Sequence, residues 1–140
     1  MTAGFEGTIL AWAGLLAAAQ LLLMAVPANL QMGSDWLAGP RDTAPPRELT
    51  GAPARLKRAF ENHVEGLVMF AAAVAAVALT GVSSPVTEGA ATVYLVARVV
   101  YVPLYAFGVP WVRSAVWAVG FFATATMLAA AALGPAGGGA

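Results

Sequence analysis

Long apolar stretches, separated by short polar or turn-forming segments, dominate the pattern of hydrophobic and polar positions along the chain. Residues 7–34, 66–87 and 114–140 contain no Asp, Glu, Lys or Arg, and only Arg98 interrupts the run 89–112. A helix needs about 20 apolar residues to cross a hydrocarbon core of roughly 30 Å. The runs are continuous and rich in Ala and Leu rather than alternating, so they predict helices and not strands.

The pattern therefore predicts an all-α fold: an integral membrane four-helix bundle in which residues 1–140 form a single membrane domain. The predicted spans are about 8–28, 57–80, 88–107 and 112–133. These helices have little interior of their own, so assembly with further copies is plausible on size alone. Small residues that allow close helix contact lie at Gly14, Ala18 and Ala25, and at Ala71, Ala72, Ala75 and Ala76. An alanine-rich composition alone would give the same pattern.

The three connections differ in length and composition. The first, residues 29–54, is rich in proline and glycine, and we expect no continuous helix there. Ser84-Pro85 predicts the start of the third helix, and the segment 108–110 predicts a tight turn before the fourth. The tail 134–140 is expected to end the fourth helix and to be disordered.

Basic residues indicate the orientation in the membrane. They lie in or beside the first connection and at the border of the third: Arg41, Arg47, Arg55, Lys57, Arg58 and Arg113. The second connection and both termini contain no Lys or Arg. The positive-inside rule therefore predicts that connections one and three are cytoplasmic and that both termini lie outside.

Composition supports the membrane interpretation and excludes several kinds of site. Charged residues make up 10% of the 140 residues, against about a quarter in soluble domains. The formal net charge is zero, so nothing points to nucleic acid as a partner. The chain has no cysteine and one histidine, so no disulfide, thiolate-metal, zinc or protein-held haem site is expected.

Polar residues recur on one face of each of the two middle helices. In the second helix they are Arg58, Asn62 and Glu65, and in the third they are Arg98, Tyr101 and Tyr105. A charged residue near the bilayer centre costs about 2.5–3.5 kcal/mol on insertion scales, so it normally faces protein or a water-filled cavity. We therefore expect these residues to face protein.

The depths of Glu65 and Arg98 are similar. Glu65 follows Arg55 by ten residues, and Arg98 precedes Gly108 by ten on a helix of opposite direction, which places both roughly 15 Å from the cytoplasmic edge. We expect their side chains to approach each other. A structural buried ion pair is the alternative for this pair taken alone. His63 lies off the polar face, and we expect it at the helix surface or the membrane interface.

The whole polar set indicates a binding cavity that opens towards the cytoplasm. Arg58, Asn62, Tyr105 and Arg113 are expected around it, below Glu65 and Arg98. An excess of arginine over carboxylate implies an anionic guest. Glu65 and Asn62 would bind an ammonium or amide group of the same guest, so the cavity suits a small zwitterionic, peptide-like molecule with several carboxylates.

Three segments, 58–65, 97–105 and 108–114, resemble the MAPEG family, the membrane-associated proteins in eicosanoid and glutathione metabolism. The R-x-x-x-N-x-x-E spacing begins at Arg58, and the resemblance is strongest over residues 55–117. It is closest to the bacterial branch and implies a bacterial inner membrane. It further implies a homotrimer with glutathione bound between subunits near the cytoplasmic side.

The resemblance also implies roles for individual residues. Those at glutathione-binding positions are Arg58, Asn62, Glu65, Arg98, Tyr101 and Tyr105. Arg113 matches the catalytic arginine beside the glutathione sulfur, where a guanidinium favours the thiolate nucleophile. The implied function is a glutathione-dependent membrane transferase or peroxidase whose lipophilic electrophile or hydroperoxide enters from the bilayer.

Some positions depart from the family's synthases. Gly66 stands where leukotriene-type synthases have tyrosine, Phe60 where they have glutamine, and the first helix ends at 29–31 without their arginine. Ser114 beside Arg113 is similar to the prostaglandin-synthase arrangement. The departures motivate an alternative, a non-catalytic lipid-binding scaffold or an accessory subunit of a larger membrane complex. A transporter subunit with a Glu65–Arg98 relay is a third possibility, but the chain has no visible inverted repeats.

Overall fold

The structure is a computed structural model that describes residues 4–46 and 48–134. All regular secondary structure in these residues is helical: α1 (Phe5–Met32), α2 (Ser34–Ala38), α3 (Gly51–Thr80), α4 (Pro85–Ala106) and α5 (Pro110–Leu133). The predicted all-α fold is confirmed. Arg47 and the tail 135–140, for which we predicted a cytoplasmic position and disorder, lie outside the described residues.

Four of the described helices, α1, α3, α4 and α5, are long and apolar enough to cross a membrane. The shortest of them has 22 residues, which corresponds to about 33 Å at the helical rise. This length matches a hydrocarbon core of roughly 30 Å. The chain is therefore an integral membrane protein with four candidate spans, as the sequence predicts.

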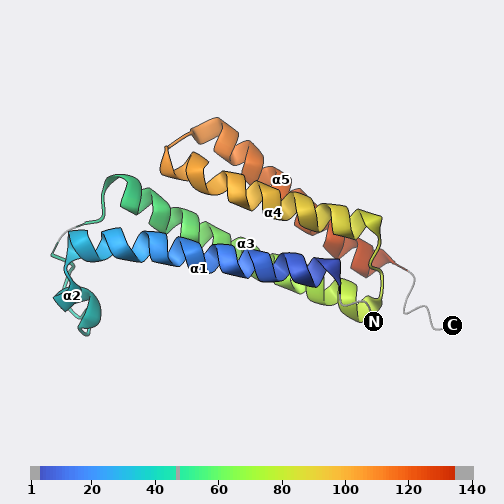
Figure 1. The fold of residues 1–140 in the computed structure, drawn as a ribbon, viewed down its shortest axis with the longest axis horizontal. Helices are drawn as coiled ribbons and strands as arrows, with labels where there is room; N and C mark the ends of the chain where they lie inside the picture. The colour runs from blue at the N-terminus through green and yellow to red at the C-terminus, as the bar shows by residue number, and fades with distance from the viewer. Residues whose placement is uncertain (1–3, 47, 135–140) are drawn as a thin grey trace.

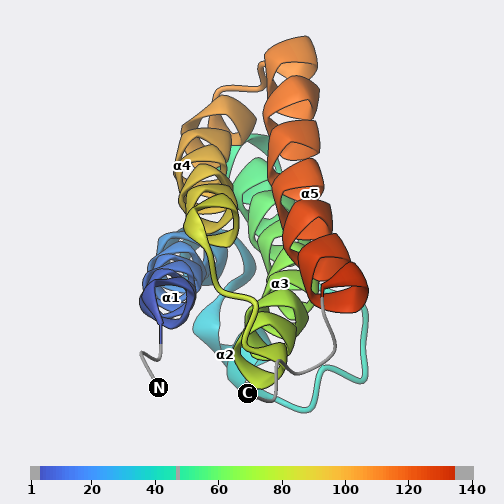
Figure 2. The same cartoon turned by 90° about the vertical axis from the view of Figure 1, so that its right-hand side faces the viewer.

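The four long helices alternate in direction (Figure 1). α1 begins and α5 ends at one end of the bundle, and the connections α1–α3 and α4–α5 lie at the other. α3 is central and packs on α1, α4 and α5, while α4 packs most extensively on α5. Figure 2 shows α1 and α5 on opposite sides of the bundle, and within the described residues they do not contact each other.

The helices flanking the first connection are longer than the predicted spans. α1 continues through Pro27 to Met32, and α3 begins at Gly51. Pro53 lies in the first turn of α3, where a backbone N–H has no intrahelical partner to lose. The helix α2 occupies part of the connection, so the non-helical segment is shorter than the predicted loop 29–54.

The start of α4 is as predicted from Ser84-Pro85. The Ser84 hydroxyl accepts from the Thr87 backbone N–H at 3.4 Å, and the Thr87 hydroxyl accepts from the Ser84 N–H at 2.8 Å. Pro85 occupies the first turn, where its fixed φ suits a helix. This reciprocal cap fixes the direction in which α4 leaves the second connection.

The apolar core lies in the half of the bundle nearer the start of α1. Its buried members are Ile9, Ala13, Phe70, Ala73, Val74, Val77, Ala91, Tyr94, Ala123 and Met127. The rings of Phe70 and Tyr94 stack with centroids 3.9 Å apart. Fully buried Ala13, Ala73 and Ala91 allow the helix backbones to approach closely.

For helix contacts within the chain, our prediction of the small residues is partly wrong. Gly14, Ala18, Ala72 and Ala75 are exposed. Spacing along one helix cannot show which of its small residues turn inward when Ala and Gly occur on several faces. The neighbouring positions Ala13 and Ala73 are the buried ones.

A buried carboxylate connects α1 to the turn between α3 and α4. Glu6 is only 3% exposed. Its carboxylate accepts hydrogen bonds from the Ser83 hydroxyl, at 2.8 and 3.0 Å, and from the Thr87 hydroxyl, at 2.5 Å. This cluster was not predicted, because its members lie far apart in the chain.

Candidate functional site

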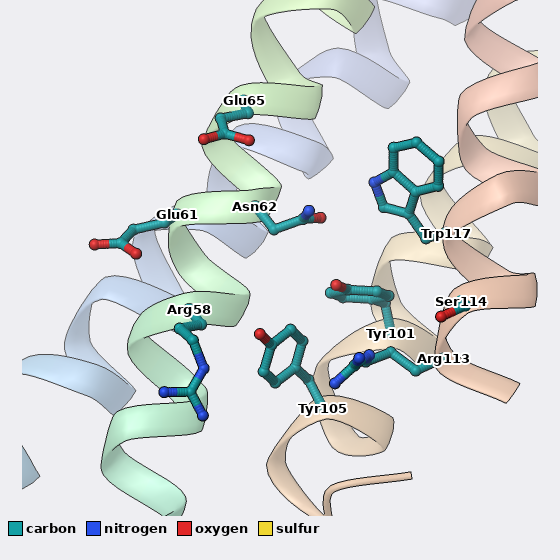
Figure 3. Close-up of a pocket in the computed structure, with 9 residues that line it drawn as sticks. All are labelled: Arg58, Glu61, Asn62, Glu65, Tyr101, Tyr105, Arg113, Ser114 and Trp117. Carbon is teal, nitrogen blue, oxygen red and sulfur yellow. The ribbon is translucent and has the colours of Figure 1, made fainter. Parts of the chain in front are cut away.

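A cavity of about 380 Å³ lies between α3, α4 and α5, in the half of the bundle near the first and third connections (Figure 3). Its size falls in the range of small-molecule sites, about 300–1,000 Å³. It is lined by polar, charged and aromatic side chains: Arg58, Glu61, Asn62, Glu65, Tyr101, Tyr105, Arg113, Ser114 and Trp117. The structure thus brings every predicted site residue to this cavity except Arg98.

Helical spacing explains how the lining residues converge. Arg58, Asn62 and Glu65 follow one face of α3, while Tyr101 and Tyr105 lie one turn apart on α4. Arg113 stands in the first turn of α5, directly after the short α4–α5 connection. Two helix faces and one helix start therefore meet around the same space.

Two guanidinium groups lie against a single phenol ring in this cavity. The Cζ atom of Arg113 is 4.5 Å from the Tyr105 ring centroid, and that of Arg58 is 6.0 Å from it. Figure 3 shows Tyr105 between the two arginines. In residues 4–46 and 48–134 the one ion pair is Lys57–Glu61. Neither cavity arginine is therefore neutralised by a carboxylate in the described part of the chain.

Arg98 lies behind the cavity and is only 3% exposed. Its Nε donates to Nδ1 of His63 at 3.2 Å, and its Nη2 donates to Oδ1 of Asn62 at 3.1 Å. Its guanidinium also lies 4.6 Å from the Tyr101 ring centroid. Arg98 was predicted at the binding surface, but its side chain lies in the interior and does not line the cavity.

The predicted approach of Glu65 and Arg98 is wrong. Glu65 is exposed and lines the cavity, and the described residues contain no ion pair between the two. Similar depth along the helices does not make two side chains point in the same direction. Arg98 points to the interior, where Asn62 and His63 are within reach.

The prediction for His63 is also wrong. The side chain is fully buried, and its Nε2 lies 3.1 Å from the backbone oxygen of Ala13 in α1. α3 packs on three long helices, so its buried surface is wider than one polar face. A signal was present in the sequence: His63 continues the spacing of the buried residues Ala59, Phe70 and Val77 along α3.

Glu61, Ser114 and Trp117 line the cavity but were not among the predicted site residues. Glu61 forms an ion pair with Lys57 one turn earlier. Ser114 donates to the backbone oxygen of Pro110 at 3.2 Å, and Trp117 stacks on Phe121 with centroids 5.4 Å apart. The spacing of Arg113 and Trp117, one helical turn apart, could have indicated the shared face of α5.

The family model that matches this chain is that of the MAPEG family, over residues 9–133. The chain belongs to the MAPEG family. No curated protein and no solved structure matches it. Membership confirms the resemblance found from the three motifs, and all residues of the cavity lie inside the matched region.

MAPEG membership relates this membrane protein, at the level of the family, to glutathione and eicosanoid metabolism. The cavity fits glutathione by chemistry. Glutathione has two carboxylates, an ammonium group and a thiol. The cavity has two glutamates, an amide and two arginines that form no ion pair within residues 4–46 and 48–134. Bidentate guanidinium groups are suited to carboxylates.

Gly66, which stands where the leukotriene-type synthases of the family have tyrosine, borders a small gap behind the cavity. A Cβ atom at Gly66 would lie 3.7 Å from the Tyr94 hydroxyl, so the missing side chain leaves room there. The gap measures about 20 Å³ and is bordered by Trp117 and Arg98 among others. This volume suits one water molecule and not part of a peptide.

Proposed function

We propose that this MAPEG protein is a glutathione-dependent transferase or peroxidase that acts on lipophilic electrophiles or hydroperoxides in the membrane. The observation that carries the proposal is the pair Arg58 and Arg113, which share the Tyr105 ring and have no carboxylate partner among the described residues. Two guanidinium groups in a cavity that also contains two glutamates suit a ligand with both carboxylates and an ammonium group.

In this proposal Arg58 binds a glutathione carboxylate, and the Asn62 amide and the Tyr101 and Tyr105 hydroxyls complete the polar contacts. Glu65, with Glu61 beside it, binds the ammonium group. Both glutamates line the cavity on α3 and are exposed. A glutathione carboxylate thus meets an arginine, and the ammonium group meets a glutamate. This arrangement fixes the orientation of the tripeptide in the cavity.

Arg113 is the proposed catalytic residue. A free thiol has a pKa of about 8.5, and an adjacent guanidinium stabilises the thiolate. Bound glutathione would supply that thiolate as the nucleophile for an electrophilic carbon or a hydroperoxide oxygen. Arg113 keeps its position because it stands in the first turn of α5 against Tyr105.

We further propose a homotrimer in a bacterial inner membrane, with connections one and three in the cytoplasm and both termini outside. The distribution of basic residues supports this orientation. Exposed Gly14 and Ala18 on α1 support the assembly, because a Cβ at Gly14 would meet nothing within 4 Å inside the chain. Such small positions suit close contact with a neighbouring subunit.

A second candidate function, a lipid-binding scaffold or accessory subunit, has one observation in its favour. An apolar groove of about 310 Å³ runs along α4 and α5, lined by Thr92, Val93, Val96, Ala97, Val100, Val116 and Val119. A scaffold would retain lipid there or join a larger complex, and it would not need glutathione. Binding and turnover of glutathione therefore discriminate between the two functions.

The decisive experiment compares wild type with Arg113→Ala in detergent, using glutathione with a chlorinated nitrobenzene or a lipid hydroperoxide. We expect Arg113→Ala to lower turnover about 100-fold or more, as for loss of one strong electrostatic contact in a transition state. The deficit should shrink as the pH approaches about 8.5, where glutathione ionises unaided. Arg113→Lys, which keeps the charge, should retain part of the activity. Wild type without thiol-dependent turnover would remove the catalytic proposal.

A further inference from the structure

A chain of buried hydrogen bonds leads from α1 to the wall of the cavity. The backbone oxygen of Ala13 lies 3.1 Å from His63 Nε2, and His63 Nδ1 lies 3.2 Å from Arg98 Nε. Arg98 Nη2 then reaches Asn62 Oδ1 at 3.1 Å. His63 is fully buried and Arg98 is 3% exposed, while Asn62 lines the cavity. The three side chains thus connect the interior to the binding site.

The chemistry of the partners fixes the direction of each hydrogen bond in this Ala13–His63–Arg98–Asn62 network. A backbone carbonyl only accepts, so His63 Nε2 carries the proton and donates to Ala13. A guanidinium only donates, so Nδ1 of His63 is unprotonated and accepts from Arg98 Nε. The ring is therefore neutral, in a single tautomer. A proton on Nδ1 would place two N–H groups against each other.

The same logic fixes the orientation of the Asn62 amide. Because Arg98 donates, the atom of Asn62 that faces it is the oxygen. The amide nitrogen then lies on the other side of the group and makes no hydrogen bond within the described residues. Figure 3 shows the Asn62 side chain extending from α3 towards Tyr101 and Trp117. Two N–H donors are thereby left for a ligand.

We infer that His63 and Arg98 are positioning residues that hold Asn62 with its amide nitrogen towards the cavity, so that this point selects a carboxylate or carbonyl oxygen of the ligand. The inference rests on the proposed function only in taking glutathione as that ligand. It assigns Arg98 to the orientation of Asn62 and not to contact with glutathione. His63 acts one step further away, by giving Arg98 Nε its acceptor.

This hydrogen-bond network ends at the binding site. Its last side chain, Asn62, lines the cavity, and the Asn62 amide nitrogen donates to no partner in residues 4–46 and 48–134. Loss of the acceptor on His63 would leave a buried donor on Arg98, which costs enough for the guanidinium to move and release Asn62.

The first measurement needs neither a ligand nor a substitution. His63 is the single histidine of the chain, so protein labelled with 15N-histidine gives the ring signals of this residue alone. We expect the pattern of a neutral ring with a protonated Nε2 and an unprotonated Nδ1. A doubly protonated ring, or a proton on Nδ1, would overturn the inference.

The second measurement is glutathione affinity by calorimetry in a matched pair of variants. His63→Asn keeps an acceptor at the δ position for Arg98, whereas His63→Gln keeps only a donor that can reach Ala13. We expect His63→Gln to raise the Kd about tenfold and His63→Asn to change it less than about threefold. Equal losses in the two variants would contradict a positioning role.

A double-mutant cycle separates positioning from general destabilisation. In an Asn62→Ala background, His63→Gln should change the Kd by less than about twofold, because its effect passes through Asn62. In an Arg58→Ala background the loss should remain about tenfold. The same loss in both backgrounds would identify a merely structural role. If wild type binds glutathione but His63→Gln binds equally well, only this inference fails; if wild type binds none, the proposed function fails.

Discussion

Two polar clusters at opposite ends of the bundle differ in whether the protein itself supplies partners for their charged groups. Near the start of α1, the Glu6 carboxylate is buried and accepts hydrogen bonds from Ser83 and Thr87. At the other end, Arg58 and Arg113 lie against a phenol and have no carboxylate partner among the described residues. The first cluster is satisfied by the fold, whereas the second leaves charge for a guest.

This difference is informative because both clusters would look alike in the sequence, as scattered polar residues in an apolar chain. Charges in a membrane protein normally pair with protein groups or face a cavity. The hydroxyl partners of Glu6 make it part of the architecture, while the position of Arg58 at a 380 Å³ cavity gives it a ligand to bind. Substitutions should therefore change stability at one end and binding at the other.

The largest effect on glutathione affinity is expected for Arg58→Ala. We expect glutathione to bind about 30-fold more weakly, because a charge-assisted contact with a carboxylate is lost, while the free energy of unfolding changes little because Arg58 is exposed. Arg41→Ala is the matched control: Arg41 also lies over an aromatic ring, that of Trp36, but away from the cavity. Calorimetry checks both variants, and an equal loss in Arg41→Ala would show that the effect is not specific to the cavity.

The opposite pattern is expected for Glu6→Ala. Hydrogen bonds to charged groups are individually strong, so we expect the protein to lose about 2 kcal/mol of unfolding free energy. Glutathione affinity should stay within about twofold at temperatures where the variant is folded, because the cavity lies at the other end. Unfolding in mixed micelles measures the first quantity. A large loss of affinity without a loss of stability would break the comparison.

The fold was predictable because the bilayer imposes simple constraints. Length and apolar continuity indicated the four spans, and Ser84-Pro85 indicated the start of α4. Helical spacing also indicated which residues of α3 share a face, so that Arg58, Asn62 and Glu65 could be expected at one cavity. These properties depend on one helix at a time and can therefore be derived from local sequence.

Properties that depend on two or more helices were predicted less well. Glu65 and Arg98 were expected at one depth in the membrane, but depth does not determine the rotation of α4 about its axis. Arg98 therefore contacts His63 and Asn62 instead. The contact between Glu6 and Thr87 is another example, since it depends on how α1 packs against the start of α4.

Gln20 offers a smaller test of the same contrast. Its side chain is buried, and neither its amide oxygen nor its amide nitrogen has a hydrogen-bond partner within the described residues. Unlike Glu6, it is a buried polar group that the fold leaves unsatisfied. Gln20→Leu removes that cost, so we expect a gain of about 1 kcal/mol in the free energy of unfolding. A loss of stability, measured in the same micelle series, would show that Gln20 has a partner in the assembled protein.

The smallest effect is expected at the exposed ion pair Lys57–Glu61, one turn long on the surface of α3. Exposed pairs of this spacing contribute about 0.3–0.5 kcal/mol, so Lys57→Ala should lower the unfolding free energy by no more than that amount.

The Lys57→Ala substitution also frees Glu61, which lines the cavity, from its competing cation. If Glu61 helps Glu65 to bind the ammonium group, the Kd for glutathione should fall slightly, by less than about twofold. Glutathione with an acetylated amino group is the control, because its affinity should not respond to Lys57→Ala. A response of equal size for both ligands would place the ammonium group elsewhere.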